Sequence, residues 1–166
     1  MKTNENYKDE NAVLYGHLKV LCECYSTGVF EPLFPLLADD IVFESQWVLT
    51  PNVGREAVED YFIGKGNTLR KKDCCPKCEI VQLVGNINPI HNADVHINGE
   101  KAKRSTFGLL YQDGKLCALM TQELQNDTVR VIIDIKINEE NKISRIDLCM
   151  PELFNYVPYF KEEEMY

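Results

Sequence analysis

The stretch from Leu36 to Phe62 indicates the fold class of this chain. It begins Leu36-Leu-Ala-Asp-Asp-Ile-Val-Phe-Glu-Ser, passes through a loop, and resumes as Gly54-Arg-Glu-Ala-Val-Glu-Asp-Tyr-Phe. The pattern predicts the end of a helix, then a buried strand from Ile41, and then a helix that begins near Gly54. This order points to a cone-shaped α+β fold, which usually encloses a pocket.

Helical spacing defines the segments on either side of the first strand. Gly28 fits the left-handed residue that ends a first helix over residues 8–27. A shorter helical segment is expected at 30–37, and a third helix runs from about Gly54 into the region of Arg70. The apolar residues that recur at helical spacing in the first helix are Leu14, Leu18, Leu21 and Tyr25.

The second half of the chain predicts mostly strands. Asp113-Gly114 is a strong two-residue hairpin signal between apolar runs. Alternation around Val131 and Ile133 puts apolar side chains on one face of a strand and a mixed set on the other. We therefore expect helices packed on a strongly curved antiparallel sheet. Its strands should lie at about 41–48, 79–84, 95–97, 104–112, 115–125, 128–138 and 143–150.

Length and charge narrow the class of protein. The chain has 166 residues, so we expect a single domain over 1–166 with an aromatic tail at 151–166. It holds 26 acidic against 18 basic residues. Nucleic acid is a poor partner for such a surface, because phosphate binding needs a dense basic patch. No apolar run approaches the ~18 residues of a membrane-spanning helix. The N-terminus also lacks a signal-peptide pattern. We therefore expect a cytoplasmic protein that has no membrane partner.

Cysteines make the most unusual local motif. There are seven, and without a secretory signal they are most simply reduced thiols. Cys75 and Cys78 form a CxxC, which is half of a zinc site, but no second CxxC completes it. A redox CxxC works best at a helix N-terminus, whereas a strand is expected here after Cys78. We therefore predict a plain loop of thiols over 74–78 with no metal, and keep zinc and redox chemistry as alternatives.

Several framework residues carry a resemblance to a known superfamily. Gly28 is followed by a helix, then by Ala38-Asp39-Asp40, a strand, Gly54-Arg55-Glu56 and an aromatic pair. Over roughly residues 12–62, this spacing resembles the nuclear transport factor 2-like (SnoaL-like, cystatin-like) superfamily, and ketosteroid isomerases in particular. The resemblance implies the cone-shaped α+β fold. It leaves function open, because the superfamily contains isomerases, cyclases, dehydratases, hydrolases and proteins without catalysis.

The isomerase chemistry implied by that resemblance is not matched. The family's general base is an aspartate just after a glutamate, and here Ser45 follows Glu44. The oxyanion-hole tyrosine corresponds to Leu21, and the aspartate that completes the hole to Ile133. The supporting tyrosine corresponds to Phe62. Losing a single oxyanion donor already costs ~10²-fold or more in rate. We therefore assign no catalytic residue and leave open whether the chain is an enzyme.

The same replacements imply an apolar interior. It suits a small apolar ligand with at most one hydrogen-bonded group, near Ser45, and requires no cofactor. The alternative is that the side chains fill the cone, which leaves a non-catalytic dimeric interaction module. The expected lining residues are Leu21, Phe43, Ser45, Trp47, Phe62, Val131 and Ile133.

The outer face of the sheet is the expected dimer surface. Proteins that resemble this fold often pair through it, and a homodimer here would add the aromatic tail. Asp147 and Asp134 should also face outward, where Asp147 can pair with Arg145 or a neighbouring strand. His17 is expected to be a hydrogen-bonded edge residue, with a pocket base as the alternative. The apolar and polar residues expected on this outer face are Val42, Glu44, Gln46, Ile132 and Leu148.

Overall fold

A computed structural model gives the fold and describes residues 4–45, 47–84, 94–97, 100–103, 114–149 and 155–160. Helix α1 spans Asn4–Thr27, the 3-10 helix η1 spans Glu31–Leu36 and helix α2 spans Arg55–Lys71. The three expected helical segments are therefore present. The strands are β1 (Leu37–Ser45), β2 (Val48–Val53), β3 (Lys77–Leu83), β4 (Asp94–Ile97), β5 (Glu100–Lys103), β6 (Leu116–Leu124), β7 (Asp127–Ile137), β8 (Ile143–Cys149) and β9 (Tyr156–Pro158).

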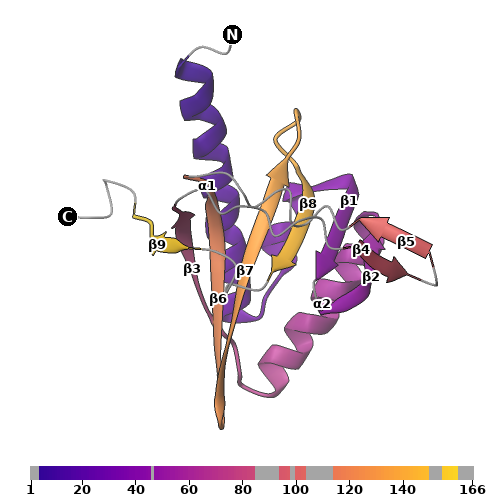
Figure 1. The fold of residues 1–166 in the computed structure, drawn as a ribbon. Coiled ribbons are helices and arrows are strands. Elements are labelled where there is room, and N and C mark those ends of the chain that lie inside the picture. Colours follow the sequence, from indigo (N-terminus) through magenta and orange to yellow (C-terminus); the bar gives the residue numbers. More distant parts are fainter. Residues whose placement is uncertain are drawn as a thin grey trace.

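Seven strands form one sheet in the order β2-β1-β8-β7-β6-β3-β9, and β4 pairs with β5 as a separate hairpin (Figure 1). The α+β class is confirmed. One detail of the prediction is corrected, because the sheet is mixed: β1 and β8 run parallel, and the other neighbours are antiparallel. No tight turn joins β1 to β8, so their direction is not forced to alternate.

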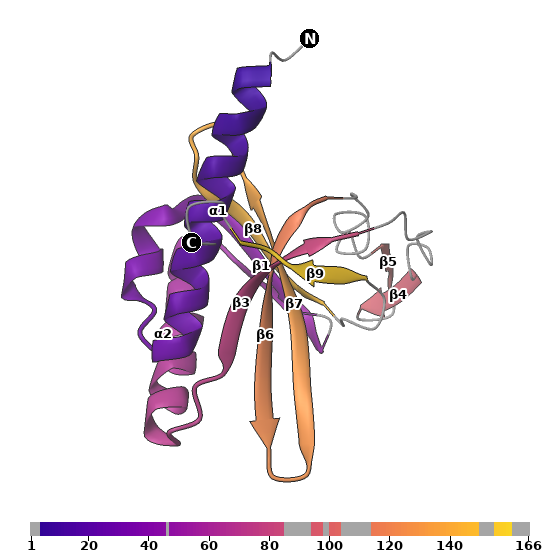
Figure 2. The same cartoon turned by 90° about the vertical axis from the view of Figure 1, so that its left-hand side faces the viewer.

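Side chains are buried on both faces of the sheet. Helices α1 and α2 lie on one side, and the β4–β5 hairpin lies on the other (Figure 2). The main core lies between the helices and the sheet. A second apolar cluster on the opposite face packs against Tyr156 of β9, and it contains Val81, Leu83, Cys117, Leu119, Ile132 and Cys149. None of the described helices is long and apolar enough to cross a bilayer.

One segment differs from the prediction, and another follows one of the two alternatives expected for it. Pro51-Asn52 predicts a break, yet both residues lie in strand β2. A proline is tolerated there because β2 ends the strand order and pairs only with β1 within the sheet. The described part of the aromatic tail, residues 155–160, packs on its own sheet, since β9 pairs with β3 and Tyr159 contacts Tyr15 edge-on at 5.9 Å between ring centroids. The strand expected at 104–112 lies outside the described residues.

Two glycines let α2 approach the end of α1. Gly28 has φ +73°, and its N–H donates to the Cys24 carbonyl at 2.8 Å, as in a left-handed helix end. A Cβ added to Gly66 would lie 2.5 Å from the Gly28 carbonyl oxygen. That carbonyl also accepts a hydrogen bond from the Arg70 guanidinium. The contact leaves no room for a side chain on either glycine.

We predict that Gly66→Ala lowers the free energy of unfolding by about 1–3 kcal/mol, because the added methyl group meets backbone rather than a movable side chain. Gly64→Ala is the matched control, since a Cβ at Gly64 of the same helix meets nothing within 4 Å. Alanine should stabilise α2 there by about 0.5–1 kcal/mol. Urea unfolding of both variants measures the difference, and equal effects would contradict the close approach.

Candidate functional site

Five of the seven expected lining residues meet on the helix-facing side of the sheet. Leu21 comes from α1, Phe43 from β1, Phe62 from α2, and Val131 and Ile133 from β7. Each is at most 4% exposed, and all five belong to the main core. The structure therefore brings these residues together and packs them against one another.

Aromatic rings occupy the centre of this interior. The Phe62 ring stacks on Phe30 at 4.9 Å between centroids and meets Tyr61 at 5.3 Å. Edge-to-face contacts to Phe43 at 5.5 Å and to Tyr25 at 6.4 Å complete the group. These separations are those of aromatic pairs in direct contact. Phe62 of α2 therefore contacts α1, β1 and the residue that precedes η1.

Ser45 lies at the margin of this interior, beside Leu148 of the main core, and Trp47 lies outside it. Strand β1 ends at Ser45, where its pairing with β2 is irregular after Phe43, so the alternation of faces does not continue to Trp47. The Trp47 side chain is 49% exposed. The Ser45 hydroxyl accepts a hydrogen bond from the Trp47 backbone N–H at 3.3 Å, which is a local turn contact.

Tyr25 supplies a polar group that sequence reasoning did not assign to the site. Its side chain is 1% exposed, and its hydroxyl has no hydrogen-bond partner within the described part of the chain. Burial raises the pKa of Tyr25 well above its ordinary value, and Tyr61, Cys78 and Cys24 add to the effect. The residue is therefore a neutral donor inside an apolar core. In the sequence, Tyr25 is one of several residues at helical spacing, and no local signal marks its hydroxyl as buried.

The cysteines of the loop at 74–78 are free thiols. All seven cysteines are free. Cys78 is hydrogen-bonded to Cys22 of α1, and that bond and burial raise its pKa. Burial raises the pKa of Cys24 to about 11. Such thiols are poor nucleophiles and poor metal ligands. Within the described ranges, no group of three or more His, Cys, Asp or Glu residues could hold a metal ion.

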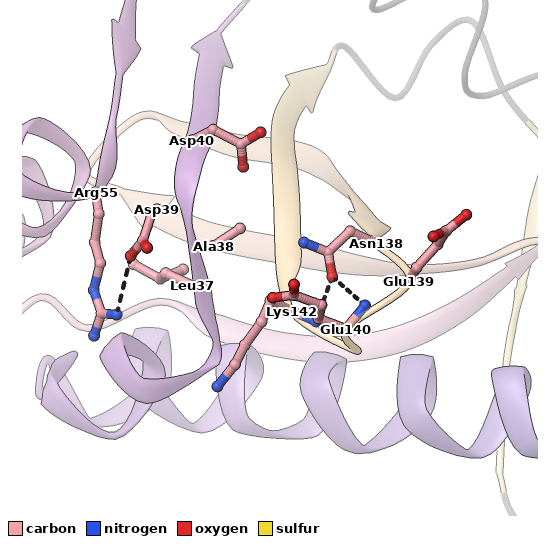
Figure 3. Close-up of a pocket in the computed structure, with 9 residues that line it drawn as sticks. All are labelled: Leu37, Ala38, Asp39, Asp40, Arg55, Asn138, Glu139, Glu140 and Lys142. Carbon is pink, nitrogen blue, oxygen red and sulfur yellow. Dashed lines mark hydrogen bonds and ion pairs between the residues drawn. The ribbon is translucent and has the colours of Figure 1, made fainter.

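A surface hollow of about 620 Å³ lies beside the start of β1 (Figure 3). Its two cations are already engaged. Arg55 Nε donates to Glu59 at 2.8 Å, and Arg55 Nη1 lies 3.7 Å from Asp39. The Lys142 ammonium donates to the Pro35 carbonyl at 2.7 Å. The hollow is lined by Leu37, Ala38, Asp39, Asp40, Arg55, Asn138, Glu139, Glu140 and Lys142.

The hollow lacks the features of a reaction site. Asp39 and Asp40 are exposed and lie on β1 itself rather than in a turn before it, because the strand begins at Leu37. Both carboxylates therefore remain hydrated, and neighbouring residues on a strand point to opposite faces. Arg55 shares a second hollow of about 600 Å³ with Asp60 and the start of α2. Neither hollow is lined by any of the five core residues.

Three further expectations concern residues other than the seven expected lining residues. The predicted ion pair is confirmed, with Arg145 Nε 3.0 Å from Asp147 Oδ2. His17 is an edge residue, as expected, with Nε2 2.7 Å from the Asn141 carbonyl oxygen. The expectation that Leu148 lies on the outer face is wrong, because Leu148 belongs to the main core. It follows Asp147, which lies on the outer face of the sheet, so its side chain points to the opposite face.

Comparison with known proteins bears on the fold. No protein-family model and no curated protein matches the sequence. A solved NTF2-like protein from Anabaena variabilis ATCC 29413 aligns with a TM-score of 0.52 at 12% identity, over 93% of this chain and 94% of that chain. The chain has the nuclear transport factor 2-like fold. A protein of unknown function from Mycobacterium tuberculosis aligns with a TM-score of 0.51 at 12% identity, over 90% of this chain and 76% of that chain.

The nuclear transport factor 2-like fold fixes where a pocket would lie but not what it does. The expected cone corresponds to the space between the helices and the sheet, and the aromatic group around Phe62 occupies it. At these identities the likeness concerns the fold alone, because many activities share one scaffold. Function has to be argued from the side chains of this chain.

We predict that Phe62→Ala lowers the free energy of unfolding by about 3–5 kcal/mol, as expected when a fully packed ring is removed. Ile63→Ala is the matched control on the same helix, because Ile63 is 42% exposed and should cost less than about 1 kcal/mol. Chemical denaturation followed by circular dichroism measures both. A Phe62 ring that lines an open pocket has fewer contacts to lose, so a cost near that of Ile63 would contradict the packed interior.

Proposed function

We propose that the chain is a non-catalytic interaction module in which the helix-facing interior serves as a structural core. The observation that carries this proposal is the mutual packing of Leu21, Phe43, Phe62, Val131 and Ile133, each at most 4% exposed. A ligand in the cone would have to displace these side chains. The proposal therefore takes the filled-cone alternative over the open pocket.

The chemistry of the interior supports the same conclusion. General acid–base catalysis needs a proton acceptor and a donor that converge on a substrate. Two carboxyl groups are buried within the described ranges, Asp134 and Asp147, and both lie on the face of the sheet away from the helices. The polar groups of the described residues in this core include thiols and the hydroxyls of Tyr15, Tyr25 and Tyr61. Burial raises the pKa of Tyr25 and of Tyr61, so neither of these two is a base near neutral pH.

The partner we propose is a second copy of the chain, docked at the β2 end of the sheet. The centre of the outer face is already buried within one chain, since Ile132 and Cys149 are 0% exposed. Apolar surface remains in the turn before β2 and at the start of that strand: Trp47 is 49% exposed and Val48 56%. Two copies related by a twofold axis would bring this patch against itself, so each residue contributes twice.

Multi-angle light scattering tests this pairing across a range of protein concentrations. We expect a mass of twice the 19.1 kDa chain at high concentration. Trp47→Glu should weaken association at least about 30-fold, the effect of losing a central aromatic contact. Leu124→Glu is the control, since Leu124 is 52% exposed at the far end of the β6–β7 hairpin. A monomer at every concentration, or equal effects of the two variants, would contradict the proposal.

The second candidate function is binding of a small apolar molecule, and the buried Tyr25 hydroxyl favours it. An unpaired buried donor is costly, and a ligand acceptor would satisfy it. This candidate moves the expected hydrogen-bonding group from Ser45 to Tyr25. It requires the aromatic group around Phe62 to open and admit the ligand.

A matched pair of probes tests this candidate. Acetophenone and ethylbenzene share a ring and a similar size, and only the ketone carries an acceptor. If Tyr25 is a ligand donor, wild type should bind acetophenone up to about tenfold more tightly, and Tyr25→Phe should abolish the difference. Isothermal titration or NMR titration measures both affinities. Absence of binding, or a preference that survives in Tyr25→Phe, would remove this candidate and leave the filled core.

A further inference from the structure

Two thiols from distant parts of the sequence meet between α1 and β3. Cys22 lies on α1, and Cys78 is the second residue of β3. The two side chains are hydrogen-bonded to each other, and both are free thiols. A hydrogen bond from sulfur to sulfur brings together the two atoms that a disulfide would join.

The backbone of each element turns these side chains toward each other. Cys22 lies one helical turn before Tyr25, and both belong to the main core, so Cys22 is on the face of α1 that packs on the sheet. Cys78 and Ile80 share one face of β3 and pack against the same core, whereas Val81 belongs to the cluster on the opposite face. The meeting of the two thiols therefore follows from how the helix packs on the strand.

The neighbouring thiols have other contacts. Cys24 lies two residues further along α1, on another side of the helix, where it is hydrogen-bonded to the backbone of Leu33. Cys75 is exposed and lies against the end of α1, since a Cβ added to Gly28 would be 3.2 Å from the Cys75 Sγ. The structure thus gives the two cysteines of the CxxC motif different neighbours, and the contact of Cys78 is with Cys22 of the helix.

We propose that Cys22 and Cys78 are a redox-sensitive pair, which a small peroxide oxidises to a disulfide that links α1 to β3. Peroxide reacts first at Cys78, the more exposed of the two, and converts its thiol to a sulfenic acid with release of one water. The Cys22 sulfur then attacks the Cys78 sulfur, so that the S–S bond forms, the S–O bond breaks and a second water leaves. The pair loses two electrons and two protons, and the peroxide takes up both.

Packing slows the reaction in both directions. Cys22 is 7% exposed and Cys78 is partly buried. The hydrogen bond to Cys22, and then burial, raise the pKa of Cys78. Because the thiolate is the reactive form, the pair should react more slowly than a fully exposed thiol. The same packing limits the access of a reducing thiol to the finished disulfide.

Peptide mapping of the folded wild-type protein tests the pairing. The protein is treated with hydrogen peroxide, the remaining thiols are alkylated, and tryptic peptides are analysed by mass spectrometry. Trypsin cuts after Lys72 and after Lys77, so Cys75 and Cys78 fall in different peptides. We expect the peptide that begins at Cys78 to be linked to the peptide that contains Cys22. A link from Cys78 to the peptide of Cys75, or no link at Cys78, would overturn the proposal.

Three variants assign the link to single residues. Cys22→Ala should abolish it. Cys24→Ala is the matched control, because Cys24 lies on the same helix and in the same tryptic peptide as Cys22, and it should keep the link. Cys75→Ala removes the exposed thiol of the motif and should also keep it. A link that persists in Cys22→Ala, or that is lost in Cys24→Ala, would mean that a different thiol is the partner of Cys78.

A second measurement needs no variant. Cys22 and Cys78 lie far apart in the sequence, so a disulfide between them closes a large loop and removes many conformations from the unfolded chain. Urea unfolding of oxidised and reduced wild type should therefore differ, with an unfolding equilibrium constant about 30-fold or more lower after oxidation. Dithiothreitol should reverse the effect. Equal stability of the two forms would contradict a disulfide between α1 and β3, even if Cys22→Ala fails to fold.

Discussion

The stacking of Phe62 against Phe30 is the contact on which the rest of the structure depends. Phe30 follows the glycine that ends α1, and Phe62 is central to α2, so the pair fixes one helix against the other. The same ring reaches Phe43 on β1 and thereby fixes both helices to the sheet. The close approach of Gly66 to Gly28 extends this contact along α2. Packing at this point decides that the space between helices and sheet is filled by the chain itself.

The two faces of the sheet divide the chemistry of the molecule. Alternation along β7 sends Ile133 toward the helices and Asp134 away from them. The helix-facing side is thereby largely apolar and aromatic, while the described residues of the other side include the buried carboxyl groups of Asp134 and Asp147 together with Lys115 and Arg145. Under the proposed function, the cone therefore serves as a structural core rather than as a reaction site. This division sets the chain apart from the isomerases that its sequence resembles, whose acid and hydroxyls would lie inside the cone.

Much of this arrangement could be predicted from the sequence. Helical spacing located α1, and strand alternation placed Val131 and Ile133 on the helix-facing side, because both periodicities are local properties of the backbone. Prediction stopped where non-local pairing takes over. The irregular end of β1 turns Trp47 to the surface, and Pro51 sits in an end strand that no local signal distinguishes from a loop. The hydrogen bond between Cys22 and Cys78 depends on how α1 packs on β3. That packing is set by the whole fold rather than by any segment.

A crystal structure under xenon pressure tests most directly whether the cone is filled. Xenon enters apolar space that is larger than the small voids of a packed core, and it needs no polar partner. If Phe62 and its neighbours fill the cone, no xenon atom should be found in contact with Phe43, Phe62 or Ile133. A xenon atom bound among these three side chains would show space for a ligand in the cone, and it would contradict the filled interior.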